Sequence, residues 1–191
     1  MRIIGIDPGS ERTGYAIIES DGTEHMAVLY GVISTSSRLP FHKRLQRIYS
    51  ELTRVLERHS ADAMAIEEVF YATNVQSALK LGHARGVALL VAAQRDLPVF
   101  EYSPLEIKGS IVGYGRAEKR QVQSMVRVLL RLPGDPPPDD AADALAVAIC
   151  HSQNSAAPIA RAAREAAGPA GKRRKKAWHA PPPKKRWRRE D

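Results

Sequence analysis

The sequence predicts an α/β fold with one mixed sheet of five strands that is flanked by helices. Three observations support this class. Short apolar and β-branched runs near the start of the chain are separated by turn residues, which is typical of antiparallel strands. A segment with apolar residues at helical spacing then lies between two strongly apolar runs, which indicates a parallel crossover. More helical segments and one further strand follow along the 191 residues.

The first three strands are expected close together in the sequence. Arg2–Asp7 is a short apolar run that ends in Asp7-Pro8-Gly9, a turn signal. Thr13–Glu19 and Met26–Thr35 are rich in β-forming residues, and Asp21-Gly22 between them is a hairpin signal. These runs therefore predict an antiparallel meander.

The crossover comes next. From Leu39 to Leu56 apolar residues recur at helical spacing with basic residues between them, which predicts an amphipathic helix. Ala63–Glu68 is then a short apolar run that ends in two glutamates, and it reads as a second buried strand. Because a strand, a helix and another strand form a right-handed parallel unit, this strand is expected to run parallel to Arg2–Asp7.

The remaining elements are mostly helical. Ser103-Pro104 is a good helix opening, because serine caps well and proline suits the first helical position. A stiff Pro136-Pro137-Pro138 spacer precedes the last helix. The expected elements are a helix from Asn74 to about Arg95, a strand at Pro98–Tyr102, a helix at Glu118–Leu130 and a helix from about Asp139 to Cys150 or His151.

Charge divides the chain into two parts. The net charge is +8, but residues 152–191 alone hold 12 lysines and arginines against 3 acidic residues. We expect a folded domain at 1–151 and a basic, disordered tail at 152–191. Such a tail suits non-specific DNA binding, and a solubilising extension is the alternative. Its notable features are the basic runs Lys172–Lys176 and Lys184–Arg189 and the nearby Trp178 and Trp187.

Several classes of protein are disfavoured. With Cys150 as its one cysteine, the chain has no internal disulfide framework. The longest apolar stretch, around Val87–Ala93, is too short to span a bilayer, and Met1–Asp7 does not resemble a signal peptide. A cytoplasmic location is expected.

Four carboxylates stand out by position. Asp7 and Glu67 end the two strands that are expected to be parallel, and ligand sites form at the carboxyl ends of such strands. Asp140 and Asp143 are three apart and share one helix face. Clustered carboxylates repel one another unless a cation binds, and oxygen ligands favour Mg²⁺ or Mn²⁺. Each acid alone also has an ordinary explanation as a turn, a cap or a solvated edge.

Several segments, taken in order, resemble the RuvC family of bacterial Holliday-junction resolvases. Any one of these motifs is weak, but the ordered set is highly specific. The resemblance covers residues 1 to about 151. The segments are Ile6–Ser10, Thr13–Tyr15, Ala65–Phe70, Ser77–Val87, Pro98–Tyr102, Ala117–Lys119 and Asp140–Ala146.

The resemblance implies a ribonuclease H-like fold, a homodimer and paired symmetric nicks across four-way DNA. The nicks would use metal-activated water and leave 5′-phosphate and 3′-hydroxyl ends. About two Mg²⁺ ions per active site are implied, with Mn²⁺ as an alternative. The RuvAB branch-migration complex is the implied partner. The acidic positions of the family fall on Asp7, Glu67, Asp140 and Asp143, and Asp139 is an alternative to Asp140.

Further residues of the family match positions in this chain. Lys108 and Lys119 match two lysines that would contact DNA phosphates, although most single lysines are simply solvated. Phe70 matches an aromatic residue that would stack on a base, with help from Tyr71; a core phenylalanine is the ordinary alternative. Gly82 and Gly86 suggest either a dimer seam or close helix packing within the chain.

Three rival functions remain at this point. The first is a ribonuclease H acting on RNA–DNA hybrids. The second is a non-catalytic junction-binding protein whose tail, residues 152–191, binds DNA. The third is an actin-like phosphotransferase, because Asp7-Pro8-Gly9 resembles a phosphate loop; the sequence has no second loop of that kind.

Overall fold

The strands form one sheet in the order β3-β2-β1-β4-β5. The computed structural model describes residues 1–68 and 75–166, with side chains as far as residue 155. β1, β2 and β3 pair antiparallel, whereas β4 pairs parallel to β1 and β5 parallel to β4. The predicted mixed five-stranded sheet is confirmed. The bounds are β1 Arg2–Asp7, β2 Arg12–Ser20, β3 His25–Ser34, β4 Ala63–Glu67 and β5 Val99–Tyr102.

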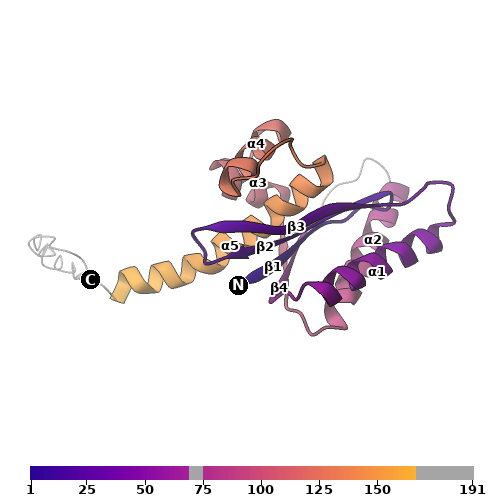
Figure 1. Cartoon of the computed structure of the whole chain (residues 1–191), viewed down its shortest axis with the longest axis horizontal. Coiled ribbons are helices and arrows are strands. Elements are labelled where there is room, and N and C mark those ends of the chain that lie inside the picture. The colour runs from indigo at the N-terminus through magenta and orange to yellow at the C-terminus, as the bar shows by residue number, and fades with distance from the viewer. Residues whose placement is uncertain (69–74, 167–191) are drawn as a thin grey trace, which may run out of the picture.

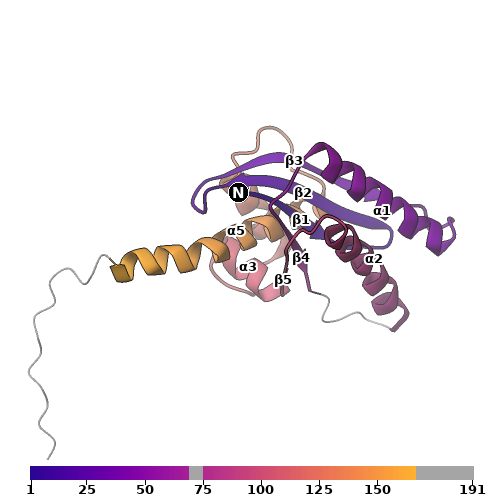
Figure 2. The same cartoon turned by 90° about the horizontal axis from the view of Figure 1, so that it is seen from below.

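Helices cover both faces of the sheet (Figures 1 and 2). On one face lie α1 (Phe41–Arg58) and α2 (Val75–Ala93), which contact each other. The other face carries α3 (Pro104–Val112), α4 (Lys119–Leu129) and α5 (Asp139–Ala166). The molecule is therefore a three-layer α/β/α structure.

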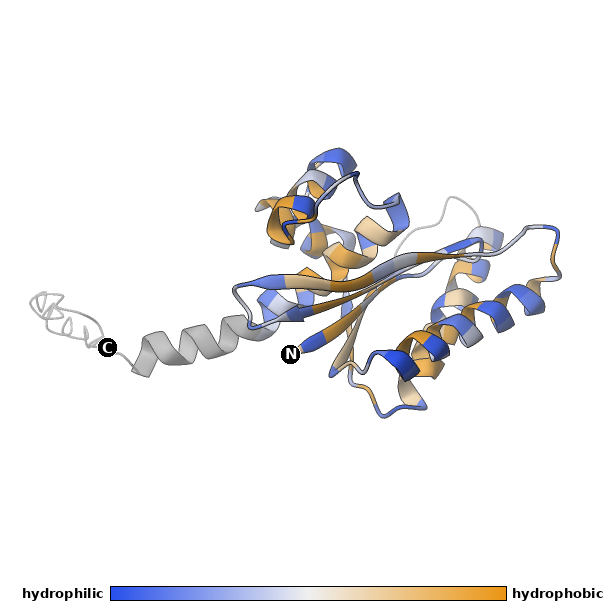
Figure 3. Cartoon of the chain, viewed as in Figure 1, coloured by the Kyte–Doolittle hydropathy of each residue, from blue (hydrophilic) through white to orange (hydrophobic). Residues whose placement is uncertain are grey.

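Alternation along the strands builds a separate core on each face. Ile4 and Ile6 of β1 are buried with α1 and α2, while Ile3 is buried with α3, α4 and α5. The same two-residue period sends Ile66 of β4 to the first core and Ala65 to the second. Because both faces are covered, the central strands are hydrophobic over much of their length (Figure 3).

Two local signals in the sequence have the predicted structural result. Gly22 takes a left-handed backbone with φ 98° in the β2–β3 hairpin, and the Asp21 carboxylate accepts hydrogen bonds from the backbone amides of Thr23 and Glu24. Ser103 caps α3, because its hydroxyl accepts from the Glu106 amide while the Glu106 carboxylate accepts from the Ser103 amide.

Two glycines let α5 lie directly on the sheet. A Cβ at Gly5 of β1 would collide with the Ala144 carbonyl oxygen and crowd Ala148. A Cβ at Gly14 of β2 would collide with the Asp140 carbonyl oxygen. The absence of side chains at these positions therefore fixes the height of the helix over β1 and β2.

α5 is longer than the sequence indicated. The expected end at residue 150 or 151 is wrong, because the helix continues to Ala166. The physical reason is composition: the added segment is rich in alanine, the best helix former, although it lacks a periodic apolar face. The proposed boundary between residues 151 and 152 thus falls inside a helix. The basic runs beyond residue 166 lie outside the described residues.

Candidate active site

The parallel pairing of β1 with β4 brings two acids to one edge of the sheet. Ile6 pairs with Ile66, and Asp7 and Glu67 each come one residue later. Alternation turns both side chains to the face that carries α5, because Ile6 and Ile66 point to the opposite face. The two carboxyl groups share a hydrogen bond.

The start of α5 adds Asp140 and Asp143 to the two acids at the sheet edge. Asp7 is the β1 partner of Gly14 on β2, and Gly14 lies against the Asp140 backbone. Asp143 is one turn further along the same helix face. Glu67, Asp140 and Asp143 all lie close enough to Asp7 for their charges to raise its pKa.

Burial and mutual repulsion suppress ionisation in this cluster. Burial, together with the charges of Glu67, Asp143 and Asp140, raises the pKa of Asp7 to about 8. Burial first and then the Asp143 charge raise the pKa of Glu67, and burial also raises that of Asp143. The raised pKa of Asp7 favours its protonated form near neutral pH when no cation is bound.

A pocket of about 260 Å³ opens beside the acids. Glu67 and Asp143 line it together with Lys108 and Lys119. The rest of its wall is largely apolar, from residues of α3, α4 and α5, which lowers the local dielectric and strengthens the charge interactions. The apolar lining is Pro104, Ile107, Val122, Ala146 and Val147.

Both predicted lysines reach the acids. Lys119 Nζ donates to Asp143 Oδ2 at 2.8 Å. Burial opposes the charge on Lys119, but this hydrogen bond and the nearby acids leave its pKa above the ordinary value. Lys108 acts on Glu67, because its charge lowers the pKa of that carboxyl against the effect of burial.

Asp140 and Asp139 have different surroundings. Asp140 is among the charges that raise the pKa of Asp7, and its carboxylate binds Arg12 at 2.6 Å. The exposed Asp139 accepts a hydrogen bond from Gln123 at 2.9 Å and lies 3.7 Å from Lys119. This difference favours Asp140 over Asp139 as the third acid of the cluster.

A family model, crossover junction endodeoxyribonuclease RuvC, matches residues 3–151. The chain belongs to the RuvC family. RuvC of Desulforamulus reducens is 50% identical over 153 residues, which span 80% of this chain and 94% of that protein. RuvC of Alkaliphilus oremlandii is 52% identical over 152 residues, or 80% of this chain and 93% of that protein.

Solved structures of RuvC also resemble this chain. The structure of Thermus thermophilus RuvC in complex with Holliday junction substrate has a TM-score of 0.79 and 34% identity, covering 83% of this chain and 96% of that one. The ribonuclease H-like fold is therefore confirmed. The chain is a crossover junction endodeoxyribonuclease, and RuvC nucleases are metal-dependent. Within the described residues, no helix is long and apolar enough to cross a membrane.

The chemistry of the donor set in this RuvC chain fits divalent cations. Four carboxylates converge where burial makes their charges costly without a counter-ion. In the described part of the chain, however, no three acidic, histidine or cysteine groups already stand as a metal cage. Two of the four acids bind cationic side chains instead: Arg12 binds Asp140 and Lys119 binds Asp143.

Arg12 was not predicted as a site residue from the sequence. No motif marks it, because its partner Asp140 is distant in the sequence and only the packing of α5 brings them together. Phe70 and Tyr71 lie outside the described residues, so their DNA contacts stay predictions.

Proposed function

We propose that this RuvC chain resolves four-way DNA junctions at the cluster of Asp7, Glu67, Asp140 and Asp143, with divalent metal bound to these acids. The observation that carries the proposal is the clustering of like charges beside a pocket that Glu67, Asp143 and two lysines line. Burying several carboxylates together is unfavourable without a counter-ion. Such an arrangement suits a centre that binds divalent cations and then DNA phosphates.

Mg²⁺ is the proposed metal, about two ions per centre, with Mn²⁺ as the alternative, because the donors are all hard carboxylate oxygens. Bound divalent cations would activate water and stabilise the departing oxygen. The carboxylates hold the site and, once Asp7 loses its proton, leave a cluster of negative charge for the cations. The apolar wall of the pocket excludes bulk water from the reacting phosphate.

Lys108 and Lys119 would bind and orient the scissile phosphate. Both line the pocket beside Glu67, and Lys119 already holds its charge close to Asp143. Their fixed positive charges would offset the negative charge that builds up on the phosphate oxygens during attack. Water attacks the phosphorus, the bond to the 3′ oxygen breaks, and the products carry 5′-phosphate and 3′-hydroxyl ends.

Four-way DNA is the proposed substrate because Thermus thermophilus RuvC was solved with a Holliday junction substrate. The match covers 96% of that protein, and the RuvC family model matches residues 3–151, which include the four acids. Phe70 and Tyr71 as base-stacking residues and RuvAB as a partner remain predictions from the family.

A homodimer is proposed from one exposed face of α2. Leu79 and Leu90 are 58% and 52% exposed, and Val75 is 74% exposed. They lie on the side opposite the buried Ala84, Ala88 and Val91, and the exposed Gly82 and Gly86 lie on the same stripe. A Cβ on either glycine would meet nothing within 4 Å, so packing within the chain does not explain them. A second copy of α2 could approach closely there.

The variant Asp7→Asn tests the catalytic assignment. Asparagine keeps the shape and still donates a hydrogen bond to Glu67, but it removes a charged metal ligand. In EDTA the variant should bind a synthetic four-way junction with wild-type affinity, and in Mg²⁺ or Mn²⁺ it should lose cleavage by about 10³-fold or more.

The matched control is Asp135→Asn, which removes the same charge from an exposed loop. It should cleave normally. Cleavage by Asp7→Asn at the control rate would overturn the assignment. A parallel assay with an RNA–DNA hybrid separates junction resolution from ribonuclease H activity.

A further inference from the structure

Arg12 binds one oxygen of a proposed metal ligand. Its Nε and Nη2 both lie 2.6 Å from Asp140 Oδ2. The Arg12 side chain is 54% exposed, whereas that of Asp140 is 23% exposed. A cation on Asp140 and the guanidinium of Arg12 would share one carboxylate group, and their like charges would repel.

We propose that Arg12 is an exchangeable counter-ion of the active site, which neutralises Asp140 until a divalent cation displaces it and then binds a phosphate of the junction. The inference rests on the proposed function, since it takes Asp140 as a metal ligand. It also explains why the described residues contain acids but no formed cage.

Other contacts hold the turn between β1 and β2, which precedes Arg12, so the arginine side chain can move without unfolding this turn. Arg44 of α1, which is 5% exposed, donates to the Ser10 carbonyl at 2.6 Å and to the Ser10 hydroxyl at 2.9 Å. Thr13 donates to the Gly9 carbonyl at 2.6 Å, and Thr35 donates to that of Ser10 at 2.8 Å. Among the described residues, the Arg12 guanidinium bonds only Asp140.

The expected competition is modest, because the ion pair is partly exposed. Exposed ion pairs contribute little free energy. Removing Arg12 should therefore raise the cation affinity by only about two- to fivefold. A role in orienting Asp140 for the metal predicts the opposite sign. Titrating Mn²⁺ into wild type and Arg12→Gln by calorimetry therefore separates the two roles.

The released guanidinium should add about one phosphate contact. Each contact contributes roughly 0.9 to the slope of log affinity against log salt. In Ca²⁺, with cleavage monitored on the same samples, Arg12→Gln should bind the junction more weakly and with a slope lower by about one. In EDTA, where Arg12 stays on Asp140, the variant should bind with the wild-type slope.

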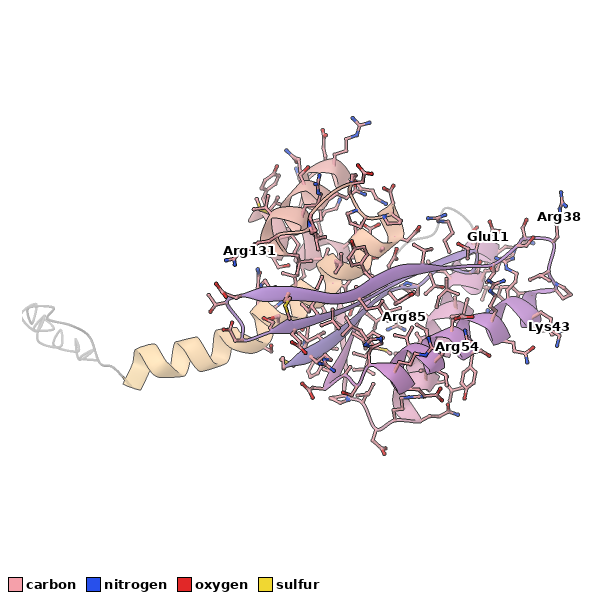
Figure 4. All side chains as sticks on the ribbon, in the orientation of Figure 1. Glu11, Arg38, Lys43, Arg54, Arg85 and Arg131 are labelled. Carbon is pink, nitrogen blue, oxygen red and sulfur yellow. The ribbon has the colours of Figure 1, made fainter. Side chains whose placement is uncertain are left out.

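The matched control is Arg54→Gln, which breaks an exposed ion pair between Arg54 and Glu51 on α1. Figure 4 labels Arg54 on this helix, which covers the face of the sheet opposite α5. This variant should leave both Mn²⁺ affinity and the cation-dependent slope unchanged. Mn²⁺ affinity in Arg12→Gln equal to or below wild type would overturn the inference, and so would an equal loss of junction binding in EDTA and Ca²⁺.

Asp7→Asn separates failure of this inference from failure of the proposed function. If wild type binds Mn²⁺ and Asp7→Asn does not, the acidic cluster is the metal site. The Arg12→Gln result then tests only whether Arg12 is an exchangeable counter-ion. If both bind Mn²⁺ equally, the proposed centre itself is wrong.

Discussion

At Asp7, burial and neighbouring charge act in the same direction, and the consequence is a dependence of stability on pH. The pKa rises from 3.8 to about 8 on folding, so the folded, metal-free protein holds a proton that the unfolded chain releases above about pH 4. This contribution to stability is complete below the unfolded pKa. It is lost progressively as pH rises to about 8, by at most about 1.4 kcal/mol per unit.

The prediction concerns Asp7→Asn without metal, where asparagine mimics the protonated acid. The variant should be more stable than wild type at pH 8, and the difference should shrink steadily toward pH 4. Urea unfolding in EDTA across this range measures it. Asp135→Asn should show no such trend, and a constant difference for Asp7→Asn would contradict the pKa shift.

Cation affinity should depend on pH in the opposite direction from the stability contribution of protonated Asp7. Divalent cations replace the proton on Asp7, so their affinity should increase with pH up to about 8, by up to tenfold per unit for each proton released. Mn²⁺ calorimetry in buffers of different ionisation enthalpy counts those protons. Affinity that is flat between pH 6 and 8 would show that Asp7 is not protonated in the metal-free protein.

At the level of elements, the approach of α5 to the sheet sets the site. Gly5 and Gly14 admit the helix, and Gly14 lies between Asp7 on β1 and the start of α5. Alanine at position 5 should cost about 1–3 kcal/mol or more, because backbone of α5 blocks the new methyl group. Alanine at position 14 should in addition shift Asp140 and reduce the cleavage rate beyond the loss expected from unfolding.

Gly109→Ala is the control for both glycines, since a Cβ in the middle of α3 would meet nothing within 4 Å. It should stabilise the protein by about 0.5–1 kcal/mol through helix propensity. Urea melts and single-turnover cleavage at a temperature where all variants are folded provide the comparison. Unchanged stability in Gly5→Ala would show that α5 does not lie as close as described.

For the whole molecule, the exposed stripe of α2 predicts the oligomeric state. Leu79→Glu places a charge in the middle of the proposed seam, where a partner would have to bury it. We expect a shift from dimer to monomer in sedimentation, with loss of paired nicks. Gln76→Glu changes an exposed α2 residue off the stripe and should stay dimeric. A dimeric Leu79→Glu would move the interface elsewhere.

The sequence by itself determined what depends on neighbours along the chain. Period-two runs give the strands, Asp21-Gly22 gives the hairpin, and Ser103-Pro104 gives a capped helix, because these signals act over a few residues. The order of elements also gave the parallel pair that brings Asp7 and Glu67 to one edge. Residues beyond 166 and the segment 69–74 stay at the level of sequence prediction.

Only the tertiary structure decided what depends on distant residues meeting. The fit of Gly14 beneath Asp140 and the pairing of Arg12 with that acid have no local signature. The raised pKa of Asp7 likewise depends on burial and on charges brought in by β4 and α5. These features depend on packing, because electrostatic and steric interactions act between residues that are close in space. Sequence patterns reflect only the spacing of residues along the chain.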